Sequence, residues 1–575
     1  MITPLDSPYN AVGDGTTDDL SAINAAAAAA AAAGDELVFP AGYTFAVSGY
    51  IIVENGVKAL RGLGGVIKLT ATGGIRLKGI HGGAGANVTD LLITGLILDA
   101  NDELSNGIEG ENVSRVRIVR NVFRNFSEPG SRVIWLISRE DGVDNPEDNV
   151  VECNEIDAFP TVALTGAESG QGAGVGIAVE AESTVATGAL DYWKANGTNL
   201  PIELPSRRTK IRFNSVNGGY YGVSLSGAED CIVVDNALRN NVRNVSVQNS
   251  SLRNKIAGNA LDECYSSSVL LSFGSSDNDI SGNFIRSARA LGEAILNNYI
   301  GCTDNRFHDN VVEIVGDAAA PAYFCYAGVH ASRVEFARNT LSGQVSKSGI
   351  TVESAWNTAI VYPYSHAKNQ PSYLNGSATG PTDGIAIRDN RLKVTTERPA
   401  IALLQVGDGA GGYALTNTIV DGNLVEGDSV DWPFYIWEDN ASCGGVRMRD
   451  NRFDPSYAAA AFAVPRGWAH FADRAGNATM DRNATPIAFA NADTTPSVGV
   501  GQLFVFANAG ATNVTNFDDG GNGQEILVRG NGNTTLVHNA SLLKLKGAVN
   551  VTPGVDGVLR LRRIAGVWVE IARNF

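Results

Sequence analysis

The stretch that decides the fold reads KIRFNSV (210–216), IVVDNAL (232–238), KIAGNAL (255–261) and DISGNFI (279–285). Each copy carries an asparagine after a short run of mostly apolar residues, and the spacings between successive asparagines are 22, 23 and 24 residues. A period in the twenties, built from short strand-like runs around a polar corner, is typical of a solenoid.

The same asparagine recurs on both sides of this stretch. The further copies are Asn121, Asn154, Asn310, Asn339, Asn390, Asn423 and Asn451. We expect the repeated asparagine to sit at a corner, to adopt the left-handed conformation and to hydrogen-bond along the stack. Alternation within a strand predicts that Ile232 and Val234 point inward. The asparagines themselves are interpreted as structural.

Composition limits the class of partner. The chain has 575 residues with 65 glycines, 19 prolines and a net charge of −17, which disfavours nucleic acid and anionic membrane surfaces. An acidic polysaccharide stays possible, because a groove can differ in charge from the average. No apolar run has transmembrane length, and the first residues lack the pattern of a Sec signal, so no membrane insertion is expected. The six scattered cysteines are predicted to be buried thiols within the coils.

A second signature lies at the start of the chain. YNAVGDGTTDDLSAIN (9–24) leads into an alanine run closed by Gly34, and ELVFPAGYTFAVSG (36–49) follows. This pattern predicts a helix from about Asp18 to Ala33, with Thr16, Asp18 and Asp19 supplying capping and first-turn negative charge. A helix placed here would cover the open end of the solenoid.

This start resembles the pectate-lyase-like superfamily of right-handed parallel β-helices, which includes polygalacturonase-like hydrolases, lyases, alginate epimerases and phage tailspikes. The resemblance implies an all-β protein: a right-handed parallel β-helix of about 12 coils. The resemblance indicates the fold but no particular reaction, because members of this superfamily differ in chemistry. The motifs typical of polygalacturonases and alginate epimerases are absent from this sequence.

The expected domains are an N-terminal cap (1–56), the β-helix (57–490) and a C-terminal module (491–575). Within the β-helix, widened gaps between asparagines predict loops at 181–207 and 355–383. The last segment has short alternating strands and NG, GG, NGN and PG turns, which predict a small antiparallel β-sandwich. It resembles the C-terminal module of phage tailspike-like proteins, which implies a homotrimer tip, while a plain capping domain is the alternative.

Candidate site residues follow from aligning one strand of each coil. The residues that alternate with apolar ones should face solvent on one sheet, among them Ala178 and Glu180, Ser224 and Ser226, and Ser246 and Gln248. Later coils place His330 and Glu353 on consecutive coils, about 5 Å apart. Glycoside hydrolysis needs two carboxyl groups, and lyase or epimerase chemistry needs a base, so Glu353, His330 and Glu180 are the catalytic candidates.

Aromatic residues in the two long loops are candidates for stacking on sugar rings. They are Trp356, Tyr362, Tyr364, Tyr192 and Trp193. Subunit contacts in a trimer are the alternative role for these aromatics, and a solvated surface is the alternative for the acidic residues. Other carboxylates near strand ends stay open as the catalytic pair: Glu293, Glu229, Asp230, Asp262 and Glu263. No metal or cofactor motif is present, so none is expected.

These features predict a virion-associated or extracellular tailspike-like protein. It would be homotrimeric, would contact other virion proteins, and would bind and endo-cleave a bacterial surface polysaccharide by hydrolysis or β-elimination. The alternative is a non-catalytic adhesin or capsid decoration protein, which the β-helix start by Tyr9 favours, since a tailspike usually carries a particle-binding domain ahead of it. A bacterial polysaccharide lyase is a third interpretation.

Overall fold

The structure is a computed structural model of the chain. It describes all residues except 79–86, 129, 140–145, 158–173, 183–199, 288–293, 300, 316–322, 329–330, 346–347, 354–381, 396–399, 405–414, 427–433, 438–445, 454–470, 474–477, 480–485 and 499–502. The chain divides into two compact units, Met1–Cys325 and Tyr326–Phe575, and each is described by itself.

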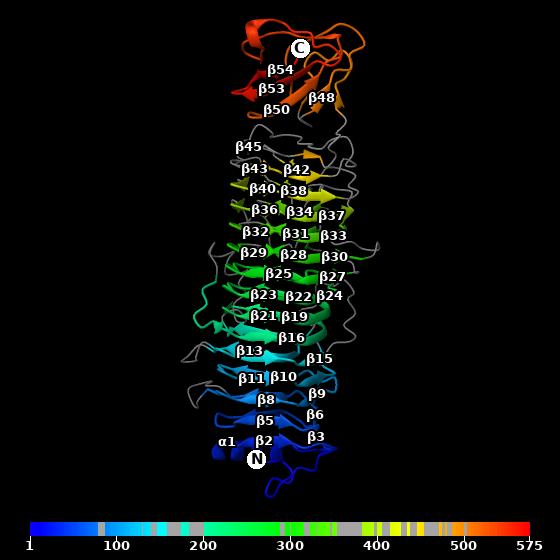
Figure 1. The fold of residues 1–575 in the computed structure, drawn as a ribbon. Coiled ribbons are helices and arrows are strands. Elements are labelled where there is room, and N and C mark those ends of the chain that lie inside the picture. Colours follow the sequence, from blue (N-terminus) through cyan, green and yellow to red (C-terminus); the bar gives the residue numbers. More distant parts are fainter. Residues whose placement is uncertain are drawn as a thin grey trace. The chain divides into compact units, whose positions relative to one another are not determined.

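The first unit is a stack of coils, each of which passes through three parallel sheets (Figure 1). The first sheet holds β2 (Glu36–Phe39), β5 (Ala59–Gly62), β8 (Leu92–Thr94), β11 (Arg117–Val119), β14 (Val150–Glu152), β18 (Lys210–Arg212), β21 (Ile232–Val234), β23 (Lys255–Ala257), β26 (Asp279–Ser281) and β29 (Arg306–His308). Ten described coils therefore belong to this unit, and five strands of the same kind lie in the second unit.

The second sheet follows the repeated asparagine. Its strands are β1 (Asp14–Asp18), β3 (Thr44–Val47), β6 (Val66–Leu69), β9 (Ile97–Asp99), β12 (Val122–Arg124), β15 (Glu155–Asp157), the first parts of β19 (Ser215–Ser226) and β22 (Ala237–Gln248), β24 (Ala260–Asp262), β27 (Phe284–Ser287) and β30 (Val311–Ile314). The two long strands bend through the next corner without a break, which joins the second and third sheets.

The third sheet positions the candidate site. Its strands are β4 (Tyr50–Val53), β7 (Gly74–Leu77), β10 (Asn106–Glu111), β13 (Arg132–Ser138), β16 (Val175–Ala181), the last parts of β19 and β22, β25 (Val269–Leu271) and β28 (Ala294–Asn298). Every pairing is parallel, so equivalent residues of successive coils stack directly above one another. A right-handed parallel β-helix, as expected from the sequence, is the result.

The core of each coil is a set of stacked aliphatic side chains. In the first sheet Ile118, Val151, Ile211, Val233 and Ile256 form one inward column and are fully buried. The prediction for β21 was therefore wrong by one position, because Ile232 and Val234 are only half-buried while Val233 points inward. Because three β-branched residues follow one another, no polar and apolar alternation shows which of them points inward.

The N-terminal helix is confirmed with shorter bounds. Helix α1 spans Leu20–Ala33 and ends at Gly34, whose φ of 59° is the left-handed conformation that a glycine C-cap permits. The capping prediction holds for Asp18, whose Oδ1 accepts the amide of Leu20 at 3.2 Å. It was wrong for Asp19, which makes no cap hydrogen bond and instead accepts the amides of Val12 and Gly13 at 2.6 and 3.0 Å. The amide of Ile52 on β4 donates to the side-chain oxygen of Asn24 at 2.8 Å, and this hydrogen bond joins α1 to β4.

The asparagine ladder is confirmed, with one change. The Nδ2 atoms of Asn214, Asn236 and Asn259 donate to the Oδ1 atoms of the next asparagine at 3.0, 3.0 and 2.9 Å. The second unit repeats this from Asn339 to Asn451. The left-handed residue, however, is the one before each asparagine, such as Phe213, Asp235 or Gly258. The asparagine amide can thus point inward and bond to its neighbours.

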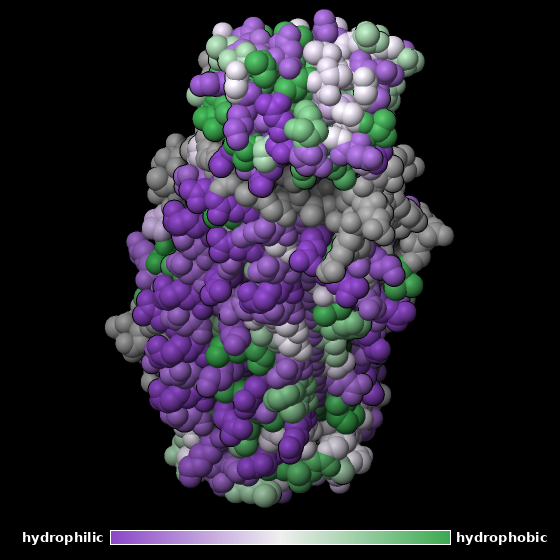
Figure 2. Space-filling model, turned by 45° about the horizontal axis from the view of Figure 1, so that its top comes forward, coloured by the Kyte–Doolittle hydropathy of each residue, from purple (hydrophilic) through white to green (hydrophobic). Residues whose placement is uncertain are grey.

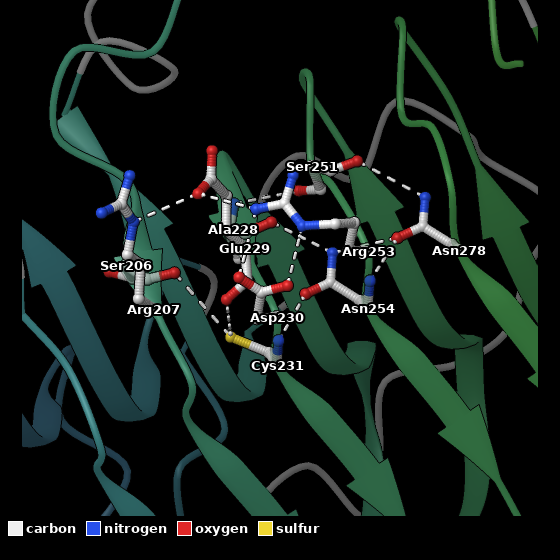
Figure 3. Close-up of polar contacts among 10 residues, drawn as sticks. All are labelled: Ser206, Arg207, Ala228, Glu229, Asp230, Cys231, Ser251, Arg253, Asn254 and Asn278. Carbon is white, nitrogen blue, oxygen red and sulfur yellow. Dashed lines mark hydrogen bonds and ion pairs between the residues drawn. The ribbon is translucent and has the colours of Figure 1, made fainter. Parts of the chain in front are cut away.

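A second ladder, which the sequence did not predict, lies at the corner that leads into the first sheet. Asn254 and Asn278 donate to the next asparagine at 3.0 Å, and Asn254 accepts the amide of Cys231 at 2.9 Å (Figure 3). The left-handed residues at this corner alternate in charge over six coils, in the order Asp90, Arg115, Asp148, Arg208, Asp230 and Arg253. They form ion pairs along the stack, such as Arg253 with Asp230 at 2.9 Å.

The cysteines follow this geometry. Cys231, Cys264, Cys302 and Cys325 are buried thiols outside any disulfide, as predicted, and burial raises the pKa of the Cys231 and Cys302 thiols to about 12. Cys153 is exposed, which contradicts the prediction, because it occupies the left-handed position before Asn154. Cys443 lies outside the described residues.

The second unit begins with coils of the same kind. Its strands are β32 (Glu335–Ala337), β33 (Thr340–Gln344), β34 (Ser348–Glu353), β36 (Ala386–Arg388), β37 (Arg391–Thr395), β38 (Ile401–Leu404), β40 (Ile419–Asp421), β41 (Leu424–Glu426), β42 (Phe434–Trp437), β43 (Val446–Arg449), β44 (Arg452–Phe453), β45 (Phe471–Asp473) and β46 (Ala478–Thr479). They pair in parallel with the strand of the next coil, for example β36 with β40 and β37 with β41.

The C-terminal module is a mixed rather than an antiparallel sandwich. One sheet contains β47 (Ile487–Ala488), β48 (Leu503–Val505), β50 (Glu525–Arg529), β53 (Val558–Ile564), β54 (Val567–Arg573) and β52 (Leu543–Lys544), and the other β49 (Thr512–Val514) and β51 (Thr534–Leu536). The NGN turn joins β50 to β51, strands of different sheets, so it makes no hairpin. A hairpin joins β53 to β54 at Ala565 and Gly566, which both have positive φ.

The module has its own core, which is rich in aromatic side chains. Phe504, Phe517 and Trp568 are fully buried, and the rings of Phe489 and Phe504 stack at 4.9 Å. The face drawn in Figure 2 is mostly hydrophilic, with hydrophobic residues scattered over it. Among the described residues there is no helix of the length and apolar character needed to span a membrane.

Candidate functional site

Most of the predicted site residues fall where the structure gives no side chain. His330, Tyr192, Trp193, Trp356, Tyr362 and Tyr364 lie outside the described residues. Glu353 is the last residue of β34, but its side chain is outside the described part. Their roles stay predictions.

Glu180 is described, and it is not the solvent-facing residue that was expected. It alternates with the inward residues Val179 and Ala181 as predicted, yet only 7% of it is exposed. The neighbouring outward positions Ala178, Ser224 and Ser246 are fully buried as well. Alternation gives the side of the sheet that a residue faces, but whether that side reaches solvent depends on what packs against it.

Glu180 belongs to a group of charged side chains on the outward side of the third sheet, which we call the glutamate–arginine cluster. Its members are Glu109 and Glu111 on β10, Arg132 on β13, Glu180 on β16, Arg76 on β7, and Arg139 and Glu182 directly after β13 and β16. Trp135 on β13 lies among them, since it pairs in register with Glu109 and with Ala178. Four consecutive coils thus contribute to one face.

Trp135 forms the centre of the cluster. Its indole Nε1–H donates to Glu180 Oε2 at 2.8 Å. Arg132 places its guanidinium carbon 4.4 Å from the centre of a Trp135 ring, and its Nε lies 3.5 Å from the same Glu180 oxygen. Arg132 therefore contacts the face of the Trp135 ring and Glu180 contacts its N–H edge. The position of Arg132 over the ring is one in which cation–π attraction is appreciable.

Arg139 joins two of the acids. It donates from Nε and Nη2 to Glu111 Oε1 at 3.1 and 2.8 Å, and from Nη1 to Glu182 Oε1 at 3.1 Å. Its backbone amide donates to Asn112 Oδ1 at 2.7 Å. Asn112 is fully buried, and its Nδ2 has no hydrogen-bond partner in the described part of the chain. A buried amide donor of this kind is satisfied in most proteins by a water or a ligand.

Glu109 anchors the opposite end of the cluster. Its Oε2 accepts from Arg76 Nη2 at 3.2 Å and from Asn106 Nδ2 at 3.0 Å, and the residue is 2% exposed. Arg76 lies over the ring of Tyr50 at 3.9 Å. Desolvation by burial, aided by the Glu109 charge, raises the pKa of Tyr50, against a lowering by Arg76.

The surroundings of Glu180 shift the pKa of its carboxyl group. Burial raises its pKa above the ordinary value for glutamate, while Arg132 and the Trp135 hydrogen bond act in the opposite direction. A raised pKa makes a carboxyl group better suited to act as a general acid.

The spacing of the carboxylates is set by the coils. Glu111, Ile137 and Glu180 are in register on β10, β13 and β16, so Glu111 and Glu180 are two strand spacings apart, about 9.6 Å between Cα atoms. Ile137 lies in register between them on β13.

The sequence pointed to only one member of this cluster. The signal for the rest was NGIEGE (106–111), where Glu109 and Glu111 occupy alternate positions, and RVIWLIS (132–138), where Trp135 has the same phase. These segments precede the first wide gap between asparagines, so no long loop marks them as a place where function concentrates.

Three comparisons with known proteins bear on the family. A family model described as periplasmic copper-binding protein (NosD) matches residues 149–376. No curated protein matches the sequence. Within the described residues, no group of three or more His, Cys, Asp or Glu side chains is placed to hold a metal ion.

The similar solved structures are distant. The surface adhesin PfbA of Streptococcus pneumoniae is 14% identical, with 70% of this chain and 93% of that chain covered and a TM-score of 0.45. The A-module of the Azotobacter vinelandii mannuronan C-5 epimerase AlgE6 is 14% identical (85% and 100% covered, TM-score 0.39). A tailspike of E. coli bacteriophage HK620, solved with a pentasaccharide, is 12% identical (83% and 80% covered, TM-score 0.42).

These similarities leave reaction and ligand open, and the fold rests on the coils themselves. Three parallel sheets per turn, in-register stacking and an internal asparagine ladder recur through both units. The chain is a right-handed parallel β-helix protein.

Proposed function

We propose that this protein binds a bacterial surface polysaccharide along the outward side of the third sheet and cleaves it at the glutamate–arginine cluster. The observation that carries the proposal is the meeting, on consecutive coils, of buried carboxyl groups with Trp135, an aromatic side chain of the kind that stacks on sugar rings. The parallel strands provide a rigid base for such a site.

The roles follow from the geometry of the cluster. Glu180, whose pKa is raised by burial, donates a proton to the glycosidic oxygen, and Glu111 is the partner carboxylate two coils away. Arg139 positions Glu111, and Arg132 and Trp135 position Glu180. The loop residues and the pair His330 and Glu353 stay as predicted contributors to binding or catalysis further along the chain.

The biological setting is part of the proposal. The resemblance of the N-terminal segment and of residues 491–575 to tailspike-like proteins supports a homotrimer on a virion or outside the cell. Other virion proteins would then be its partners. The mixed sandwich of the C-terminal module is compatible with a trimer tip or with a plain cap.

The test uses the full chain and a panel of bacterial capsule and lipopolysaccharide preparations. Binding is measured as a dissociation constant and cleavage as a fall in chain length by size-exclusion chromatography. We expect Glu180→Gln to lower the cleavage rate about 100-fold or more, and Glu111→Gln to do the same. The matched control is Glu152→Gln, which removes a glutamate paired with Arg212 at 3.1 Å on the first sheet.

Full cleavage by both variants would overturn the assignment of the site. Binding without any shortening of a polymer would instead favour the second candidate, a non-catalytic adhesin or decoration protein. One observation favours that alternative: each glutamate of the cluster already has a partner in an arginine, asparagine or tryptophan, as in a purely structural network.

A further inference from the structure

The charges of the glutamate–arginine cluster limit which saccharide can bind there. It contains the three arginines Arg76, Arg132 and Arg139, and four glutamates. Each arginine lies against at least one of these glutamates, within 3.5 Å. The net charge is −1 when all groups are ionised and zero when Glu180 holds its proton.

The hydrogen-bonding capacity points in the same direction. In the described part of the chain, one carboxyl oxygen of each of three glutamates accepts no hydrogen bond. These atoms are Glu109 Oε1, Glu111 Oε2 and Glu180 Oε1. Carboxylate oxygens accept and do not donate, so these positions recognise hydroxyl and N–H groups and repel other carboxylates.

An anionic sugar would need a cation that is not already neutralised. Uronate-binding sites offer such a cation to the sugar carboxylate, and β-elimination depends on it because it makes the neighbouring C–H acidic. The next arginine in register along this face, Arg243, lies three strand spacings from Arg132, about 14 Å between Cα atoms, and so stands outside the cluster. The buried and unsatisfied Nδ2 of Asn112 adds a neutral donor, which suits a sugar hydroxyl or an acetamido oxygen.

We infer that the saccharide bound at this cluster is uncharged, with hydroxyl and acetamido groups but no carboxylate, and that the reaction is hydrolysis. This inference rests on the proposed function and deepens it. A sugar without a carboxylate cannot undergo β-elimination, so the lyase alternative falls away for this site.

The hydrolytic step balances with the residues present. The Glu180 carboxyl proton passes to the glycosidic oxygen as the C1–O bond breaks and its electron pair moves to that oxygen. Water attacks C1 from the opposite side and gives its proton to the Glu111 carboxylate. Attack on the face opposite the leaving group inverts the configuration at C1, and exchange of protons with solvent restores both groups.

The experiment compares polymers rather than variants, so it does not depend on a mutant folding. The native protein is titrated with a panel of neutral, acetamido-bearing, uronate-bearing and sulfated polysaccharides at about 50 and about 500 mM NaCl. We expect binding to uncharged polymers only, with less than about a 2-fold change in Kd between the two salt concentrations, because no ion pair to the ligand forms. Products should carry the inverted anomer by NMR and show no ultraviolet absorbance from unsaturated chain ends.

Two results would overturn the inference. Binding to a uronate or sulfated polymer that weakens about 10-fold or more at high salt, or that yields unsaturated products, would contradict the uncharged ligand yet leave the proposed function standing. Failure of every polymer to bind would overturn both. Glu180→Gln and Glu152→Gln, assayed on whichever polymer binds, show whether the effect arises at the cluster.

Discussion

Two sets of buried polar side chains in the first unit, the asparagine ladder through Asn259 and the glutamate–arginine cluster, differ in how their hydrogen bonds are satisfied. The asparagine ladder repeats one residue, and each amide both donates to and accepts from its neighbours. The glutamate–arginine cluster repeats nothing, places charges at low exposure, and leaves carboxyl oxygens and an asparagine amide without partners among the described residues. The comparison teaches that a closed network stabilises the coils, while an open one has capacity left for a ligand.

The largest expected effect comes from breaking the closed network. Asn259 makes four side-chain hydrogen bonds, two accepted from Asn236 and two donated to Val233 and Asn283. Asn259→Ala should lower the free energy of unfolding by about 4 kcal/mol, because several buried groups lose their partners. Hydrogen exchange of peptides from the neighbouring coils measures this loss.

The control for the ladder is Asn217→Ala. Asn217 is half-buried; its Nδ2 donates to Asp157 at 2.7 Å and its Oδ1 accepts from Asn240 at 2.7 Å. We expect a loss of about 1 kcal/mol or less. Equal losses in the two variants would mean that the ladder stabilises the coils no more than a surface hydrogen bond does.

The second prediction breaks the cluster. Arg139→Gln leaves Glu111 and Glu182 without their cation and should cost about 3 kcal/mol of stability. The double variant Arg139→Gln/Glu111→Gln should recover much of that loss, because it removes the stranded charge as well. Chemical denaturation of the single and double variants checks this, and a further loss in the double variant would contradict it.

The third prediction concerns pH. The pKa of Glu180 is raised in the folded protein, so its contribution to stability is fully present below the ordinary glutamate pKa and is lost as pH rises through the folded value. Glu180→Gln cannot lose a proton, and its stability relative to the native protein should therefore increase with pH above about 4.3. The relative gain in the free energy of unfolding should reach about 1.4 kcal/mol for each tenfold increase in the proton affinity of Glu180 on folding.

Thermal denaturation from about pH 4 to about pH 8 measures this trend, with Glu152→Gln as a variant that removes a glutamate from the first sheet. A stability difference that stays constant over this range would show that Glu180 titrates as an ordinary carboxyl group, and the assignment of its role as proton donor would be withdrawn.

The smallest effect is expected at a corner. Cys153 has a φ of 56°, so Cys153→Gly should stabilise the protein by about 1 kcal/mol by relieving left-handed backbone strain. Cys231→Gly should instead destabilise it, because Cys231 fills a buried position. Melting temperatures test the pair. In native protein a thiol reagent should label Cys153 ahead of the four buried cysteines, and labelling in the reverse order would contradict the corner assignment.

The sequence was a good guide wherever a feature repeats. The ladder and the helix up to Gly34 are local patterns of spacing, and the structure confirms them. The sequence predicted three features wrongly: which residues of IVV (232–234) point inward, the burial of Cys153, and the strands that the NGN turn at 531–533 connects. In each of these cases the outcome depends on which residue takes the left-handed conformation or which strands pair.

What the sequence by itself determined is the coil: its length, its corners and its inward aliphatic columns, because stacked parallel strands need the same residue type at the same place in every turn. What only the tertiary structure decided is the cluster. Glu109, Trp135 and Glu180 are 26 and 45 residues apart along the chain, and it is the in-register pairing of β10, β13 and β16 that brings them together. Burial, which no spacing reveals, then raises the pKa of the Glu180 carboxyl group.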